Sequence, residues 1–258
     1  MSQRLDWSEY GAVNSVKLLA GGGGEIHLLT GHDDGQLVVS SVNTEAVNTL
    51  KVISHHDNIL WSIDISSQHV TTCSEDRTVA VYDRGELVSS LPPSPRPSCR
   101  LLGHTQAVTC VSLAEHIITT GSRDKTVIVW SLATHSDQYQ VLAVLEVVVE
   151  SQSVTSHLSS SQGHQEILHF VSQDEHRIYS SDHNGELFVW DKRRLLEGGQ
   201  SHQGQLLLRR VDYGEERGAI DCMVVRGQCA SQCLHYGPVL FRNTTAHVIR
   251  RLGIRFYQ

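Results

Sequence analysis

The chain has 258 residues, 40% hydrophobic and 19% charged, which is the composition of a globular protein long enough to bury one large core or two smaller ones. Its formal net charge of −7 disfavours general nucleic-acid binding. The longest apolar stretch, Val141–Val149, is interrupted by Glu146 and is too short to cross a bilayer, and the first seven residues lack the apolar core of a secretion signal.

The charge is unevenly distributed along the chain. Residues 1–191 carry 10 basic and 23 acidic side chains (10 − 23 = −13), whereas residues 192–258 carry 11 and 5 (11 − 5 = +6). This asymmetry is either chance or a sign that one part meets a basic partner and the other an acidic one. The six cysteines follow no disulfide or zinc spacing, which favours buried thiols in a reducing compartment, the cytoplasm or the nucleus.

Short apolar segments rich in β-branched residues follow one another along the chain, separated by Gly, Asp and Ser, which predicts antiparallel strands. The clearest series is 107–113, 116–120 and 126–130. The glycine run 21–24 precedes no helix or Lys-Ser/Thr pair, so it predicts a hairpin turn rather than a phosphate-binding loop. The segment 91–98, with four of the five prolines, predicts an exposed connector, a proline-motif ligand or a Ser94-Pro95 phosphorylation site.

One pattern recurs four times in these segments. In each copy a hydroxyl residue stands four positions before an acid or amide. An aromatic residue usually stands six positions after the acid or amide, and in three copies a histidine stands twenty positions before it. The acids or amides are 42, 48 and 60 residues apart, and about four strands fit in each period, as in one blade of a β-propeller. The four copies are Thr30/Asp34/Ser40, His56/Thr72/Asp76/Tyr82, His104/Thr120/Asp124/Trp130 and His164/Ser180/Asn184/Trp190.

The third copy resembles a WD40 repeat, because it starts with Gly103-His104 and ends at Trp130, although Ser131 stands where the family has Asp. The second and fourth copies end in Tyr82-Asp83 and Trp190-Asp191. The resemblance covers about residues 10–195. Residues 218–225 and 229–242 resemble strands of a further blade that lacks the acid and the tryptophan.

The resemblance implies an all-β WD40 β-propeller with about five recognisable blades in a single domain, residues 1–258. The family most often closes with seven blades, so either the ring is small, or end blades are degenerate, or the chain is a fragment or short isoform of a longer protein. The outer strand of the last blade is expected from residues 1–7 or from 247–254. The approximate blades are 8–48, 49–99, 100–147, 148–212 and 213–258.

The trio His104, Thr120 and Asp124 has the composition of a catalytic site, but a catalytic site has no reason to recur around a scaffold. The WD40 resemblance instead implies a buried network in which the acid accepts from the histidine, the histidine meets the hydroxyl, and the hydroxyl accepts from the Trp indole. We expect weaker networks at Tyr82 and Asn184. We expect no catalytic residue, cofactor or metal, since Cys229 and Cys233 with His235, like the His55-His56 pair, lack a second ligand pair.

The predicted function is a non-enzymatic scaffold that binds proteins or peptides, without membrane attachment. The residues before the turn acids or amides, Asp33, Glu75, Arg123 and His183, are either contacts on one rim or ordinary solvated turn residues.

The alternative is a substrate receptor of a cullin-RING ubiquitin ligase. Trp190-Asp191-x-Arg193 is similar to the box by which some WD40 proteins dock on a cullin-4 adaptor. The short hairpins between first and second strands also resemble F-box/WD proteins. A propeller enzyme would need a cluster of acids, bases or metal ligands that does not repeat, and the sequence contains none.

Overall fold

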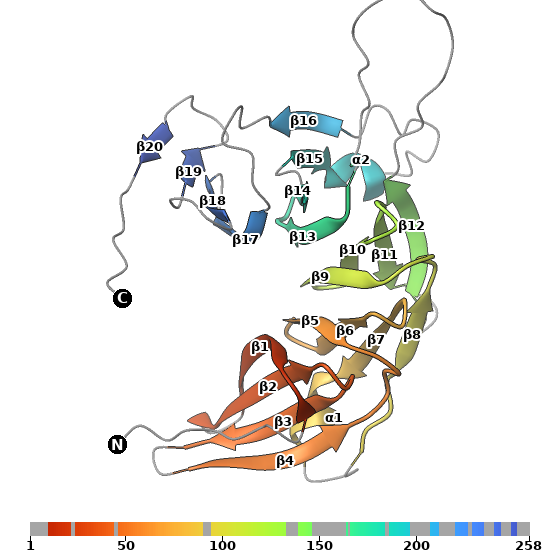
Figure 1. Ribbon diagram of the computed structural model, residues 1–258, viewed down its shortest axis with the longest axis vertical. Helices are drawn as coiled ribbons and strands as arrows, with labels where there is room; N and C mark the ends of the chain where they lie inside the picture. The colour runs from red at the N-terminus through yellow and green to blue at the C-terminus, as the bar shows by residue number, and fades with distance from the viewer. Residues whose placement is uncertain are drawn as a thin grey trace, which may run out of the picture. The chain divides into compact units, whose positions relative to one another are not determined.

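The regular structure is almost entirely β-strand, arranged as five four-stranded sheets in the described part of the chain (Figure 1). In every sheet each strand pairs with its neighbour in sequence, so each is an up-and-down meander. The predicted all-β class is therefore confirmed, with five sheets for the five expected blades. The computed structural model describes residues 10–21, 24–43, 46–89, 94–132, 139–145, 164, 166–183, 186–196, 207–211, 220–226, 229–234, 240–243 and 249–251.

The chain divides into two compact units. The first comprises Met1–Thr120 with Trp130–Gln140, and the second Gly121–Val129 with Val141–Gln258. Two sheets lie wholly in the first unit. Their strands are β1 (Val13–Ala20), β2 (Ile26–His32), β3 (Leu37–Val42) and β4 (Val47–Ile53), then β5 (Leu60–Ile65), β6 (His69–Ser74), β7 (Thr78–Asp83) and β8 (Cys99–Leu102).

The third sheet contains the boundary between the units, and the fourth and fifth sheets belong to the second unit. The third consists of β9 (Val108–Ala114), β10 (Ile117–Ser122), β11 (Val127–Leu132) and β12 (Tyr139–Leu145). The fourth consists of β13 (Leu168–Gln173), β14 (Arg177–Asp182), β15 (Leu187–Asp191) and β16 (Leu207–Val211), and the fifth of β17 (Ile220–Arg226), β18 (Cys229–Leu234), β19 (Leu240–Asn243) and β20 (Ile249–Arg251).

The fourth strand of the last sheet was predicted from residues 1–7 or from residues 247–254, and it comes from the second of these segments. β20 lies inside the range 247–254 and pairs antiparallel with β19, with Leu240 opposite Arg251. The other candidate, residues 1–7, lies outside the described residues. The loss of the acid and the tryptophan from this part of the sequence therefore did not prevent a four-stranded sheet.

Two five-residue helices, α1 (Arg84–Val88) and α2 (Lys192–Leu196), follow the third strands of the second and fourth sheets and were not predicted. The Asp83 side chain caps α1 by accepting a hydrogen bond from Glu86 N–H, and Asp191 Oδ1 accepts one from Arg193 N–H at 3.1 Å. A carboxylate at such a position satisfies an unpaired helix N–H. The acid that ends each of these two repeats is thus also the N-cap of a short helix.

The core of the first unit lies between its first two sheets. Leu19, Leu29 and Val39 from the first sheet pack with Leu60 and Ile63 from β5, and each of these side chains is at most 1% exposed. Each buried leucine or isoleucine contributes about 1.5–3 kcal/mol through removal of apolar surface from water. This packing holds the turns of the two sheets in a fixed relation.

Two glycines allow these sheets to approach closely. A Cβ atom on Gly31 would lie 2.3 Å from Leu60 Cδ2, and one on Gly35, whose φ is +82°, would lie 2.7 Å from the carbonyl oxygens of both His56 and Asn58. The turn between β2 and β3 therefore lies directly against the loop that precedes β5. Larger residues would force these segments apart.

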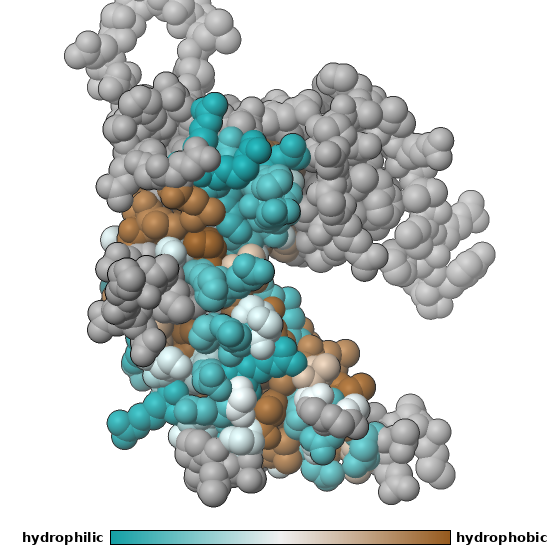
Figure 2. All heavy atoms as spheres, turned by 180° about the vertical axis from the view of Figure 1, so that it is seen from behind, coloured by the Kyte–Doolittle hydropathy of each residue, from teal (hydrophilic) through white to brown (hydrophobic). Residues whose placement is uncertain are grey.

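The described surface mixes polar and apolar areas (Figure 2). Val16, Leu18 and Ile26 are 54%, 67% and 45% exposed, and by register they lie on one face of the first sheet, opposite the face that packs on β5. Within the described ranges, no helix is long and apolar enough to cross a membrane.

Candidate functional site

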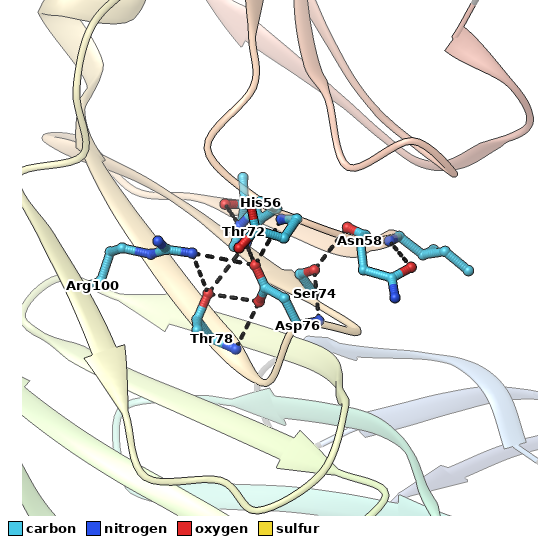
Figure 3. A network of polar contacts seen from close by, with 9 residues as sticks. His56, Asn58, Thr72, Ser74, Asp76, Thr78 and Arg100 are labelled. Carbon is cyan, nitrogen blue, oxygen red and sulfur yellow. Dashed lines mark hydrogen bonds and ion pairs between the residues drawn. The ribbon is translucent and has the colours of Figure 1, made fainter.

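The second sheet contains a polar network centred on Asp76, in the turn between β6 and β7 (Figure 3). Asp76 Oδ2 lies 2.9 Å from His56 Nδ1, and Asp76 Oδ1 accepts hydrogen bonds from the N–H of Thr78 at 2.9 Å and from its hydroxyl at 2.7 Å. His56 Nε2 lies 2.8 Å from Thr72 Oγ1. The network joins the loop before β5 to β6 and to the following turn.

The charge of Asp76 is stabilised by this network. Burial alone raises the pKa of the carboxyl, but hydrogen bonding and charge interaction with His56, together with the two hydrogen bonds from Thr78, outweigh burial and hold the pKa well below its ordinary value. Arg100 on the outer strand β8 approaches the same oxygen, with 3.3 Å between Nη2 and Oδ2. Asp76 is therefore an ionised anchor for three segments of the sheet.

Tyr82 occupies the place that an indole takes in the third and fourth sheets. Its side chain is 1% exposed, and its hydroxyl hydrogen bonds with Thr72. Burial raises the pKa of Tyr82 to about 12, so the phenol stays protonated at neutral pH. The sequence predicted a weaker network at Tyr82, and in the structure the tyrosine hydroxyl reaches the threonine of its own repeat, Thr72.

In the third sheet, side chains of a histidine and a tryptophan meet at the hydroxyl of Thr120. The Thr120 hydroxyl lies 2.8 Å from His104 Nε2 and accepts a hydrogen bond from the Trp130 indole N–H at 3.0 Å. In the turn, Asp124 Oδ1 accepts hydrogen bonds from Thr126 N–H at 3.0 Å and from its hydroxyl at 2.6 Å. The threonine two residues after the acid thus supports the turn here as Thr78 does in the second sheet, a role that the sequence pattern had not included.

The fourth sheet repeats the inner part of the network around Ser180. The Ser180 hydroxyl lies 2.7 Å from His164 Nε2 and accepts a hydrogen bond from Trp190 N–H at 2.8 Å. The three side chains are at most 8% exposed. A serine therefore takes the part that threonine has in the two preceding sheets.

The carboxylate in this network differs from the sequence prediction. Asn184, the predicted partner of His164, lies outside the described residues, and the oxygen that His164 Nδ1 meets is Asp182 Oδ2 at 3.1 Å. Asp182 is completely buried and stands two residues after the hydroxyl, where Ser74 and Ser122 stand in the second and third sheets. The fourth network therefore contains a carboxylate on the strand itself. The sequence indicated this, because Asp182 stands where the second and third repeats have serine.

The first sheet also contains a histidine beside its hydroxyl, which the sequence pattern missed. Thr30 Oγ1 lies 2.8 Å from Nε2 of His32, and the rings of His32 and Tyr10 form a T-shaped pair with their centroids 5.5 Å apart. This histidine follows the hydroxyl by two residues instead of preceding it by sixteen. Ser40, at the position of the missing aromatic ring, is 1% exposed.

In the first and second sheets, the side chain of the residue before the turn acid accepts a hydrogen bond from a residue at a bulge in the sheet's first strand. Asn14 lies at the irregularity of β1 and donates to Asp33 Oδ1 at 2.8 Å. Trp61 lies at the corresponding irregularity of β5 and donates from its indole N–H to Glu75 Oε2 at 2.7 Å. We call these paired positions, one on the bulge and one before the turn acid, the turn-side rim.

The second unit has the same pairing in its fourth sheet. His169, at the irregularity of β13, places Nε2 3.1 Å from Nδ1 of His183. In the third sheet Arg123 follows Thr109 by fourteen residues, the same separation as in the pairs His169–His183 and Trp61–Glu75. The predicted contact residues Asp33, Glu75, Arg123 and His183 therefore stand at one repeated position of the fold.

Comparison with known families identifies the repeat. Residues 47–83 and 95–131 match the family described as WD domain, G-beta repeat (WD40). The chain contains WD40 repeats. These two segments contain β4 to β7 and β8 to β11, so each WD40 unit runs from the outer strand of one sheet through three strands of the next.

Curated relatives of this WD40-repeat chain are longer proteins. CCR4-associated factor 4 of Saccharomyces cerevisiae is 26% identical over 171 residues, which cover 62% of this chain and 25% of the relative. Histone acetyltransferase type B subunit 2 of Aspergillus fumigatus is 30% identical over 107 residues, which cover 40% and 24%. The chain thus spans about a quarter of the length of either relative.

A solved structure shares the WD40-repeat chain's fold. The computationally designed Ika8 protein superposes with a TM-score of 0.63 at 17% sequence identity, covering 93% of this chain and 61% of that protein. At this identity the likeness concerns the fold alone.

Arg193, the last residue of the Trp-Asp-x-Arg box at the end of the fourth sheet, lies in α2. Its side chain is 60% exposed, and its Nε is 3.6 Å from Asp191 Oδ1. Arg194 is 56% exposed and lies 3.7 Å from the other oxygen of Asp191. Two guanidinium groups therefore flank one largely buried carboxylate.

Metal binding by several ligands finds no support in the described part of the WD40-repeat chain, where no group of three or more His, Cys, Asp or Glu side chains could hold an ion. His235 and the side chains of Cys229 and Cys233 lie outside the described residues.

Proposed function

We propose that this chain is a non-enzymatic docking scaffold whose turn-side rim binds proteins or peptides. The observation that carries the proposal is that one backbone arrangement presents different chemistry in successive sheets: an amide with a carboxylate at Asn14 and Asp33, an indole with a carboxylate at Trp61 and Glu75, and two imidazoles at His169 and His183. A repeated framework with varied side chains is suited to recognition of an irregular protein surface.

The buried networks belong to the framework in this proposal. His56 with Thr72, His104 with Thr120 and His164 with Ser180 have nearly the same distances, 2.8, 2.8 and 2.7 Å, in three different sheets. A group needed for chemistry would be expected once, whereas a group that fixes strands is needed in every sheet. Removing one member would leave a buried polar partner unpaired, at a cost of about 1–3 kcal/mol.

The names of the relatives support protein partners. One is called an associated factor and another a subunit of an acetyltransferase. Both names describe proteins that act together with other proteins. The negative net charge and the predicted reducing environment agree with a protein-binding role inside the cell, in the cytoplasm or the nucleus.

The proposal is tested by affinity purification from a native cell extract with charge-reversed variants. We expect Asp33→Lys and Glu75→Lys to lose a protein that the wild-type chain recovers. Glu115→Lys is the matched control, because Glu115 is an exposed acid in the turn at the other end of β10 from Arg123. Equal recovery by the rim variants and the wild type, or loss with Glu115→Lys alone, would contradict the proposal.

A second candidate is the substrate receptor of a cullin-RING ubiquitin ligase. The observation that favours it is the 60% exposure of the Arg193 side chain, two residues after Asp191, since an exposed guanidinium can pair with acidic groups of an adaptor. Purification followed by detection of cullin adaptors tests this candidate. Loss of the adaptor with Arg193→Ala but not with Arg194→Ala would support it, and recovery of no adaptor by the wild type would exclude it.

A further inference from the structure

The histidine pair on the fourth sheet is chemically different from the other rim pairs. Asn14–Asp33 and Trp61–Glu75 each join a donor to a carboxylate acceptor, whereas His169 and His183 each offer an imidazole that can donate or accept. In their hydrogen bond one ring must donate N–H to the lone pair of the other. Both nitrogens are therefore potential ligands to a metal ion.

The fold itself brings the two rings together. The bulge in β13 turns His169 toward the end of β14, and the backbone N–H of His183 donates to Ile167 O at 2.9 Å, which fixes the start of the turn. The same positions in the first and second sheets hold side-chain atoms 2.8 and 2.7 Å apart. The closeness of the two imidazoles thus follows from the repeated backbone, not from their attraction to each other.

The spacing of the two nitrogens matches a metal chelate. Zinc–imidazole bonds are about 2.0–2.1 Å long. Two nitrogens 3.1 Å apart that bind the same ion would therefore give an N–metal–N angle of about 98°. This angle lies between the square-planar and tetrahedral values that Cu²⁺ and Zn²⁺ prefer. A swing of both rings about their Cβ–Cγ bonds would aim the lone pairs at one point, and the planes already differ by only 33°.

We propose that His169 and His183 form a two-histidine site for a divalent transition-metal ion such as Zn²⁺ or Cu²⁺, with positions left open for water or for a donor side chain of another molecule. The ion takes the place of the hydrogen between the rings, and the donor ring carries its proton on its other nitrogen. The exposure of both residues lets this exchange pass through solvent. This inference does not depend on rim docking, because the chelate needs only these two side chains.

The test is isothermal titration of the full chain with Zn²⁺ at pH 7.5, for the wild type, His169→Ala, His183→Ala and the double variant. We expect each substitution to remove one zinc equivalent or to weaken it by about tenfold or more. Zinc bound elsewhere among the sixteen histidines is common to all variants and cancels in this comparison. Identical titrations of the wild type and the double variant would overturn the proposal.

His176→Ala is the matched control. His176 is also exposed, lies in the turn between β13 and β14 at the other end of these strands, and has Glu175 at 3.9 Å. We expect its titration to equal that of the wild type, and a loss as large as that of His183→Ala would contradict the assignment.

Discussion

Lys17 on β1 and Asp64 on β5 form an ion pair between the first and second sheets, with 2.9 Å between Nζ and Oδ1. The second oxygen of the same carboxylate, Oδ2, accepts the backbone N–H of Leu113 on β9 at 2.7 Å. Asp64 is 21% exposed and Lys17 is 42% exposed. One carboxylate therefore connects the first strands of three successive sheets.

The first prediction is that Asp64→Asn destabilises the protein more than Lys17→Met. Asparagine keeps the shape of the side chain but loses the charge that both donors meet, so we expect a loss of about 1–2 kcal/mol. Lys17 is half-exposed, and removing it should cost less than about 1 kcal/mol because water replaces the ammonium group. Urea unfolding followed by circular dichroism measures both values. Equal losses would show that the bond to Leu113 contributes nothing.

The second prediction concerns Asp76 and acid stability. A carboxyl whose pKa is lower in the folded than in the unfolded state stabilises the fold fully above the unfolded value, about 3.9, and loses that contribution as the pH falls toward the folded value. The stability difference between wild type and Asp76→Asn should therefore be constant above about pH 5 and shrink below about pH 4. Chemical unfolding at a series of pH values measures this difference.

Asp57→Asn is the control for acid stability, since Asp57 is exposed and neighbours the same network through its backbone N–H, which donates to Asp76 Oδ2 at 3.1 Å. Asp57→Asn removes a neighbouring acidic charge but keeps Asp76, His56 and Thr78, so it controls for the loss of a nearby charge alone. A difference for Asp76→Asn that stays constant down to pH 2.5 would contradict an ionised anchor.

Each of three repeats has the same spacing between its histidine and a hydroxyl residue, so the sequence predicted one kind of contact three times. In the structure His56, His104 and His164 lie 2.8, 2.8 and 2.7 Å from Thr72, Thr120 and Ser180. The rim pairs were only half predicted. The residues before the turn acids were named, but their partners depend on a bulge that the alternation of apolar residues does not reveal.

Departures from the repeat could not be interpreted without the structure. Asp182 and His32 each stand two residues after their hydroxyl, and a strand position is needed to see that both side chains face the network. Tyr82 reaches Thr72 through the length of its side chain, which spacing alone does not measure. The short helices start at Asp83 and Asp191, whose carboxylates accept N–H groups of the first helical turn, and the repeat pattern gave no sign of this capping role.

The third prediction tests the carboxylate of the fourth sheet. Asp182→Ala should cost about 1–3 kcal/mol, because it leaves the buried His164 without the carboxylate at its Nδ1. Asp182→Ser should also destabilise. If position 184 corresponds to Asp76, as the repeat predicts, then Asp182→Ser with Asn184→Asp should recover part of that loss. A double-mutant cycle by urea unfolding measures the coupling, and strictly additive losses would argue against the correspondence.

The fourth prediction compares two adjacent leucines on β1. Leu19 is 1% exposed and packs in the core between the first two sheets, so Leu19→Ala should cost about 2–5 kcal/mol. Leu18 is 67% exposed on the opposite face, and Leu18→Ala should change the free energy of unfolding by less than about 0.5 kcal/mol. Both substitutions remove the same atoms from the same strand, so strand propensity is matched. A large loss for Leu18→Ala in dilute solution would show that this face of the first sheet is covered.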